Sequence, residues 1–201
     1  MYVKIALFCL AALGQPPRLS AQAPAPAPLV ALAHVTLEIN RLEAGPEEFA
    51  RLTGVVPVNA GPHEHRPSEN ALASLGSWAY LEILAPLPSA AGTRPSPFTR
   101  LTPTTWSLAS PDLDALIARL QSAGFETAEP VEGSRRLPDG SVLRWRTVHL
   151  RGAGLELAPY FIQWAPDMPH PSATSPAGCR LAEFELAEPN PARLQRLFDA
   201  I

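Results

Sequence analysis

One order of patterns, a strand, a helix and then three strands, occurs twice along this chain and favours two similar modules. The first pass has a strand pattern at 32–39, a helix from Pro46 and strands over 71–84. The second pass has a strand at 104–109, a helix capped by Asp112 and strands over 142–164. The alternation of strand and helix predicts a single α+β domain.

The segments that close the two modules support a true internal repeat. Tyr80 to Pro86 and Tyr160 to Pro166 align without gaps, and both begin with Tyr and end with Ala-Pro. A third start follows, because 186–190 resembles 108–112 and also precedes a leucine-bearing segment. This unit stops at Ile201 after one strand and one helix. Two interpretations remain open: a truncated chain, or a half-module that covers a sheet edge.

The N-terminal segment is typical of a secretion signal. Lys4 provides the positive charge, 5–14 is a short apolar run, and small residues precede an expected cut after Ala21. An uncleaved membrane tether is the alternative, although the run is short for a bilayer span. Cleavage would leave Cys179 as the only cysteine, so we expect no intramolecular disulfide. The Ala/Pro-rich stretch 22–28 is a linker, and the domain covers 29–201.

Composition restricts the partners. The chain is 46% hydrophobic and 17% charged, with a formal net charge of -3, which is typical of a globular protein and argues against nucleic acid as a partner. Gly-x-Ser-x-Gly, His-Glu-x-x-His and P-loop patterns are all missing from the sequence, so serine hydrolase, zincin and nucleotide-binding functions have no support.

Several short segments together resemble the glyoxalase-like domains of the vicinal oxygen chelate superfamily. The segments are 32–37, 70–72 with 80–82, 136–145, 159–164 and 170–172. The resemblance implies two βαβββ modules that form a curved mixed sheet around a cavity, here 29–88 and 102–166, with a partial third βα unit at 178–201. It also implies a divalent metal held by a His on the first strand and a Glu on the last strand of each module.

Only the first module keeps the metal ligands that the resemblance implies. His34 and Glu82 occupy the two positions, and this pair suits Zn, Fe, Mn or Ni. Thr105 replaces the second His, and Ile162 or Gln163 replaces the second Glu. Glu82 is also the expected proton-transfer group. Thus the sequence predicts half of the family's metal site.

Other candidates have weaker support. His63 could bind metal or substrate or be a solvated loop residue, and His170 could be an acid–base group or simply order a proline-rich connection. Glu183 stands at the position of His34 in the third unit, and an arginine such as Arg144 could meet a substrate carboxylate. We therefore expect the substrate pocket to include His63, Trp106, Arg144, Gln163 and Glu183.

These observations predict a secreted or periplasmic protein that performs metal-assisted isomerase, lyase or dioxygenase chemistry on a small oxygen-bearing organic molecule. The alternative is a non-catalytic small-molecule binding protein with a degraded metal site, its pocket lined by Trp106, Tyr160, Trp164 and His34. After cleavage we expect no stable membrane insertion. Completion of the sheet by a second protomer, as a homodimer, is a further expectation.

Overall fold

The computed structural model describes residues 3–9, 30–64, 66–76, 78–89, 92–137 and 140–201. The expected cleavage site after Ala21, the Ala/Pro linker 22–28 and the central part of the turn at 138–140 lie outside these residues. None of the helices in the described ranges is long and apolar enough to cross a membrane.

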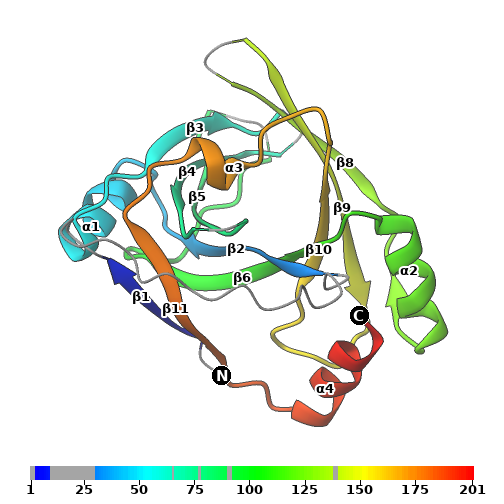
Figure 1. Ribbon diagram of the computed structural model, residues 1–201. Coiled ribbons are helices and arrows are strands. Elements are labelled where there is room, and N and C mark those ends of the chain that lie inside the picture. The colour runs from blue at the N-terminus through cyan, green and yellow to red at the C-terminus, as the bar shows by residue number, and fades with distance from the viewer. Residues whose placement is uncertain (1–2, 10–29, 65, 77, 90–91, 138–139) are drawn as a thin grey trace, which may run out of the picture.

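The two modules appear in the predicted order, each starting with a strand and a helix (Figure 1). The first module consists of β2 Ala31–Glu38, α1 Ala44–Thr53, β3 Val58–Pro62, β4 Ser68–Ser74 and β5 Tyr80–Pro86. The second consists of β6 Thr102–Ala109, α2 Leu113–Ser122, β7 Glu126–Thr127, β8 Val131–Arg136, β9 Val142–Arg151 and β10 Tyr160–Trp164. The short strand β7 is an addition to the predicted pattern.

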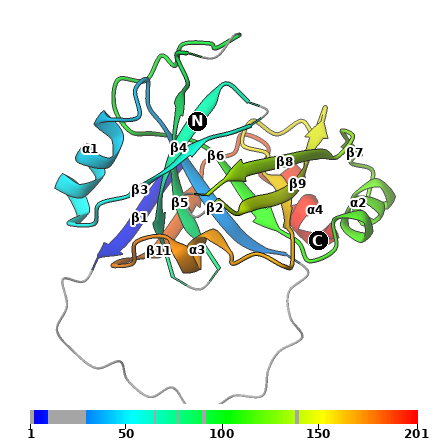
Figure 2. The same cartoon turned by 90° about the horizontal axis from the view of Figure 1, so that it is seen from above.

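The strands of both modules form one curved mixed sheet, as Figures 1 and 2 show. Its order is β3-β4-β5-β2-β6-β10-β9-β7, and β8 pairs with β9 beside this path. The modules meet where β2 and β6 pair antiparallel, while β5 runs parallel to β2 and β10 runs parallel to β6. The predicted α+β class and curved mixed sheet are confirmed.

Strand alternation separates the core from the opposite face of the sheet. In β2, Val35 and Leu37 are buried apolar residues, and in β5, Leu81 and Ile83 belong to the first hydrophobic core with Phe49 of α1. The residues between them, at 34, 36, 80 and 82, point to the other face because side chains in a strand alternate with period two. The sequence therefore places one core and one polar surface on the same two strands.

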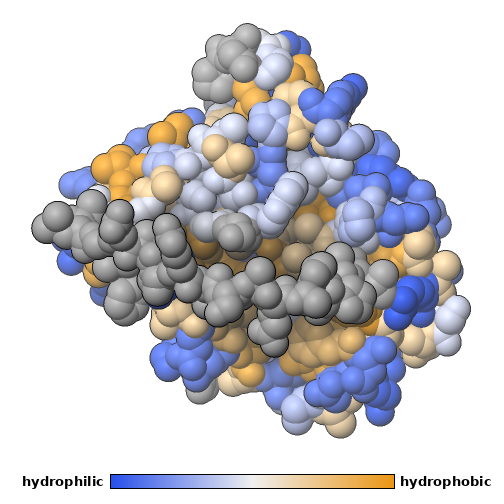
Figure 3. Space-filling model, in the orientation of Figure 1, coloured by the Kyte–Doolittle hydropathy of each residue, from blue (hydrophilic) through white to orange (hydrophobic). Residues whose placement is uncertain are grey.

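Helix α2 carries the second core. Leu113, Leu116 and Leu120 are buried on one stripe, and they pack in a cluster with Phe125 and Phe161. Asp112 caps the helix as predicted, because its side chain accepts a hydrogen bond of 2.9 Å from the Ala115 amide. Hydrophilic residues predominate along the edge of the molecule over α2 in Figure 3.

The partial third unit is present as β11 Cys179–Leu186 and α4 Pro191–Ala200, preceded by the short helix α3 Pro171–Thr174. Asn190 caps α4, and Leu197 is fully buried in the second core. Helix α4 therefore anchors the C-terminal unit to the second module.

Part of the predicted leader has a structural role in the full-length chain. Val3–Cys9 forms β1, which pairs antiparallel with β11 and directs Ile5 and Leu7 onto the first core. Cys179 is disulfide-bonded, and the backbone of Cys9, the other cysteine of the chain, lies opposite it. The expectation of no intramolecular disulfide concerns a chain cleaved after Ala21 and stays a prediction, since the structure describes the full-length chain.

Candidate functional site

A cavity of about 110 Å³ lies on the polar face of the sheet. Both modules contribute, because β2, β4 and β5 of the first face β6, β9 and β10 of the second across it. The described lining residues are His34, Thr36, His63, Arg66, Asn70, Tyr80, Glu82, Leu84, Thr105, Arg135, Trp145, Thr147, His149, Tyr160, Ile162 and Trp164. The predicted pair His34 and Glu82 therefore lies in one cavity.

His34 is held from both sides. Its Nδ1 lies 2.9 Å from Ser107 Oγ, and its Nε2 contacts the Tyr160 hydroxyl. The imidazole also stacks on the Tyr80 ring, with centroids 4.6 Å apart. Burial lowers the pKa of His34 to about 4. The side chain is therefore a neutral imidazole at physiological pH, which is the form that binds metals.

Glu82 lies next to His34, with 3.6 Å between Glu82 Oε2 and His34 Nε2. Asn70 Nδ2 donates to Oε1 at 2.6 Å, and the Thr36 hydroxyl donates to Oε2 at 3.1 Å. Burial alone would raise the pKa of this carboxyl, but the facing imidazoles of His34 and His63 and the two hydrogen bonds outweigh burial and lower the pKa. Glu82 is a buried, ionised carboxylate.

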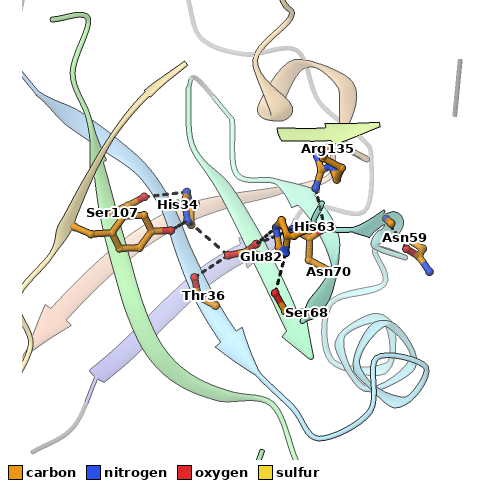
Figure 4. Close-up of polar contacts among 11 residues, drawn as sticks. His34, Thr36, Asn59, His63, Ser68, Asn70, Glu82, Ser107 and Arg135 are labelled. Atoms are coloured by element: carbon orange, nitrogen blue, oxygen red, sulfur yellow. Dashed lines mark hydrogen bonds and ion pairs between the residues drawn. The ribbon is translucent and has the colours of Figure 1, made fainter. Parts of the chain in front are cut away.

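His63 approaches the same carboxylate from the opposite side (Figure 4). It lies between β3 and β4, and 3.9 Å separate its Nε2 from Glu82 Oε1. Its Nδ1 lies 2.9 Å from Ser68 Oγ, so a serine anchors this imidazole as Ser107 anchors the other. Burial lowers the pKa of His63 as well. The structure thus favours the site interpretation of His63 over a solvated loop.

The result is a carboxylate between two imidazoles, each fixed at Nδ1 by a serine hydroxyl. If each Nδ1–H donates to its serine, the Nε2 atoms of His34 and His63 accept from the Tyr160 hydroxyl and the Asn70 amide, and this is the tautomer that a metal ligand requires. Within the described ranges, no three His, Cys, Asp or Glu side chains already form a complete metal-binding group. Binding one ion by all three would require the two imidazoles, which lie on opposite sides of Glu82, to move toward one another.

The second module faces the cavity with residues that are poor metal ligands. Thr105 and Ile162 both line it, so Ile162 is the structural counterpart of Glu82. Gln163 points away: its Nε2 donates to Pro111 O at 2.7 Å, and its Oε1 accepts from the Leu113 amide. The second module therefore lacks the His and Glu ligands of the family pattern at these positions, as the sequence indicated.

Four residues expected in the pocket, Trp106, Arg144, Gln163 and Glu183, do not line this cavity. Trp106 is buried in the second core, where its indole donates to Leu157 O. Arg144 pairs with Asp167 at 2.6 Å on the surface, and Glu183 pairs with Lys4 there. Gln163 is the fourth. Alternation along a strand identifies two faces but not which one meets a cavity, and this explains the misplacement.

His170 lies behind the cavity rather than in its lining. Its ring packs against Trp78, Tyr80 and Trp164, and its Nδ1 accepts a hydrogen bond from the Ser172 amide as the cap of α3. The geometry favours the structural alternative for His170 over acid–base catalysis.

Arg135 is the most important cavity residue outside the expected pocket, for which Arg144 was chosen from the arginines at 135, 136, 144 and 146. It extends from β8 into the cavity, is 4% exposed, and donates from Nη1 to Asn70 Oδ1 at 2.8 Å. His149 was also missed; it stacks on Tyr160 with centroids 5.1 Å apart. The run Arg135-Arg136 followed by a turn was visible, but only the hairpin geometry shows which arginine turns inward.

Solved structures with a similar fold include a hypothetical protein from Staphylococcus aureus (TM-score 0.57, 18% identity, covering 72% of this chain and 63% of that one). Methylmalonyl-CoA epimerase from Mycobacterium tuberculosis is another (TM-score 0.51, 22% identity, covering 72% of this chain and 95% of that one). At these identities the likeness concerns the fold alone. Among curated proteins, none matches the chain in sequence.

The family comparison covers most of the molecule. Residues 32–201 match the glyoxalase-like domain, a range that runs from β2 to the end of α4. The paired modules, the mixed sheet and the cavity between them agree with this match. The chain belongs to the glyoxalase-like domain family of the vicinal oxygen chelate superfamily.

Proposed function

We propose that the protein is a metal-assisted enzyme that acts on a small oxygen-bearing organic substrate, in an isomerase, lyase or dioxygenase type of reaction. One observation carries the proposal: His34 and His63 present Nε2 to the two oxygens of Glu82, at 3.6 and 3.9 Å. Two imidazoles and one carboxylate are a donor set that suits Zn and Fe and leaves positions open for substrate.

The donor set suits a divalent ion in its chemistry. Ligand atoms bonded at about 2.1 Å in a tetrahedral site lie about 3.4 Å apart. His34 Nε2 and His63 Nε2 lie 3.6 and 3.9 Å from different oxygens of Glu82, on opposite sides of the carboxylate, so one ion held by all three would require the imidazoles to turn toward each other. A bound divalent ion would supply Lewis acidity toward a substrate oxygen. His34, His63 and Glu82 would hold it.

Other cavity residues have roles that do not depend on the ion. Burial raises the pKa of Tyr160, so its hydroxyl remains protonated and contacts His34 Nε2. Trp145 and Trp164, whose ring centroids are 5.4 Å apart, form an apolar wall that limits water near the reacting group. We assign Glu82 the role of supplying the negative charge of the site, because both of its oxygens already accept hydrogen bonds from Thr36 and Asn70.

Metal titration tests the proposal. We expect metal-free full-length protein to bind one Zn²⁺, Fe²⁺, Mn²⁺ or Ni²⁺ per chain in isothermal titration calorimetry. The thermal midpoint should rise as well, because free metal at 1,000 times Kd stabilises a fold by about 4 kcal/mol. A chain that binds none of the four ions in calorimetry would contradict the metal site.

A non-catalytic binding protein is the second candidate. Thr105 and Ile162 line the cavity at the positions of the missing ligands, and this observation favours it. The same titration separates the two: stabilisation by small organic ligands without any metal response would support the binding protein.

We propose in addition that the chain is exported, on the basis of the apolar run 5–14 and the small residues before Ala21. Cleavage there would remove β1 and leave β11 without this partner. N-terminal sequencing of protein from its native cells should give Gln22 as the first residue. A sequence that begins near Met1 would instead assign β1 to the mature fold.

A further inference from the structure

A second concavity, a groove of about 530 Å³, lies directly beside the cavity. Val58, Leu72, Leu137 and Met168 give it an apolar lining, and Val58 is 53% exposed at its rim. Among the described residues, Arg135 is the only one that lines both the groove and the cavity. We call this concavity the Leu72 groove.

The strand β4 connects the two spaces. Asn70 and Leu72 share one face of this strand, with Asn70 directed to Glu82 and Leu72 directed to the groove. Figure 4 shows Arg135 beside Asn70, on the side away from His34. A ligand that passes Arg135 can therefore have one end near Glu82 and the other in the Leu72 groove.

Arg135 is a buried cation that forms no direct ion pair in the described part of the chain, and Glu82 acts on it only at longer range. Its Nε has no hydrogen-bond partner there, and the residue is only 4% exposed. Nη1 bonds a neutral amide oxygen of Asn70. A buried, incompletely paired guanidinium is costly, and an entering anion would relieve this cost.

The charge of the cavity favours an anionic ligand. Its charged lining residues are Arg66, Arg135 and Glu82, so the described lining has a net charge of +1, although the whole chain has -3. A divalent ion would add two positive charges. Among the described residues that line the Leu72 groove, Arg135 is the only charged one, so the region beyond it suits a hydrocarbon chain.

We propose that this combined site binds a small organic acid with an apolar tail. The carboxylate meets the Arg135 guanidinium, an adjacent oxygen-bearing carbon faces Glu82, and the tail lies in the Leu72 groove. This inference rests on the proposed function for the reacting end and goes beyond it in naming the substrate class. It assigns the carboxylate role, which the sequence had suggested for Arg144, to Arg135.

Calorimetry with three probes tests the inference: 2-oxobutanoate, 2-oxooctanoate and the uncharged ketone 2-octanone. We expect 2-oxooctanoate to bind at least about tenfold more tightly than 2-oxobutanoate, because each buried methylene is worth about a fourfold change in Kd. We also expect it to bind at least about tenfold more tightly than 2-octanone, because only the acid meets Arg135. Equal affinity for both acids, or for acid and ketone, would overturn the proposal.

Three variants locate the two contacts. Arg135→Gln retains a donor for Asn70 and should reduce 2-oxooctanoate affinity to that of the ketone, whereas Arg135→Lys should recover part of it. Ala60→Phe narrows the groove and should remove the chain-length effect while 2-oxobutanoate still binds as in the wild type. Unchanged binding of the acids to correctly folded Arg135→Gln protein, judged by circular dichroism, would also overturn the proposal.

The metal titration is independent of these results. Arg135→Gln should bind Zn²⁺ within about threefold of the wild type, since Arg135 contributes no metal ligand. Acid binding that depends on Arg135 in a chain that binds no metal would refute the proposed function and leave this inference standing. Metal binding without any preference for the acids over the ketone would support the proposed function and refute this inference.

Discussion

Glu82→Gln is expected to reduce metal affinity by at least about 100-fold and to abolish metal-dependent activity. The glutamine keeps the size of the side chain but removes the one negative charge between His34 and His63. A neutral amide is a weak ligand, and divalent ions depend on the carboxylate for charge compensation. Calorimetric titration with Zn²⁺ measures the change.

Two further variants make this prediction specific. Thr36→Val removes the hydrogen bond to Glu82 Oε2 but leaves the carboxylate, so we expect a smaller loss, about tenfold to 100-fold, as is usual for residues that orient a ligand. Glu69→Gln changes a carboxylate outside the cavity lining and should bind metal as the wild type does. Equal metal affinity in Glu82→Gln and Glu69→Gln would contradict the assignment.

Acidification should destabilise the fold between pH 6.5 and pH 4, in part through His170. Burial among Trp78, Tyr80 and Trp164 lowers the pKa of His170 to about 4, and the neighbouring His34 acts in the same direction. In this window the unfolded chain binds a proton at His170 and the folded chain does not, so stability falls as pH falls. The full shift corresponds to about 3 kcal/mol.

Urea denaturation at pH 7 and pH 4.5 measures this contribution. His170→Asn keeps a cap for α3 but cannot be protonated, so its loss of stability on acidification should be smaller than that of the wild type by about 2 kcal/mol. Ser172→Ala removes a hydroxyl partner of His170 but keeps the imidazole, and it should retain most of the acid sensitivity. An identical pH response in His170→Asn and the wild type would rule out the linkage.

The repeated order of elements was sufficient to predict the modules and their sheet. Tyr80 and Tyr160 open equivalent strands, and both side chains reach the cavity. Asp112 before a leucine stripe located α2. These features succeed because they are local: strand period, helix period and caps depend on neighbouring residues.

The sequence placed residues at the cavity where alternation along a strand determined their side, and it misplaced residues where tertiary pairing decided. His34 and Glu82 follow from alternation on β2 and β5. Arg135 and Arg144 lie on two strands of one hairpin, and only their pairing shows that Arg135 turns to the cavity while Arg144 meets Asp167. The role of Val3–Cys9 as a strand depends on β11, more than 160 residues later.

X-ray absorption spectroscopy of the zinc-loaded protein tests the central claim most directly. We predict scattering from two imidazoles and at least one oxygen ligand, with bonds of about 2.0 to 2.1 Å. His63→Ala should reduce the imidazoles from two to one. Zinc surrounded by oxygen alone, or an imidazole number that does not change in His63→Ala, would contradict a metal centre formed by His34, His63 and Glu82.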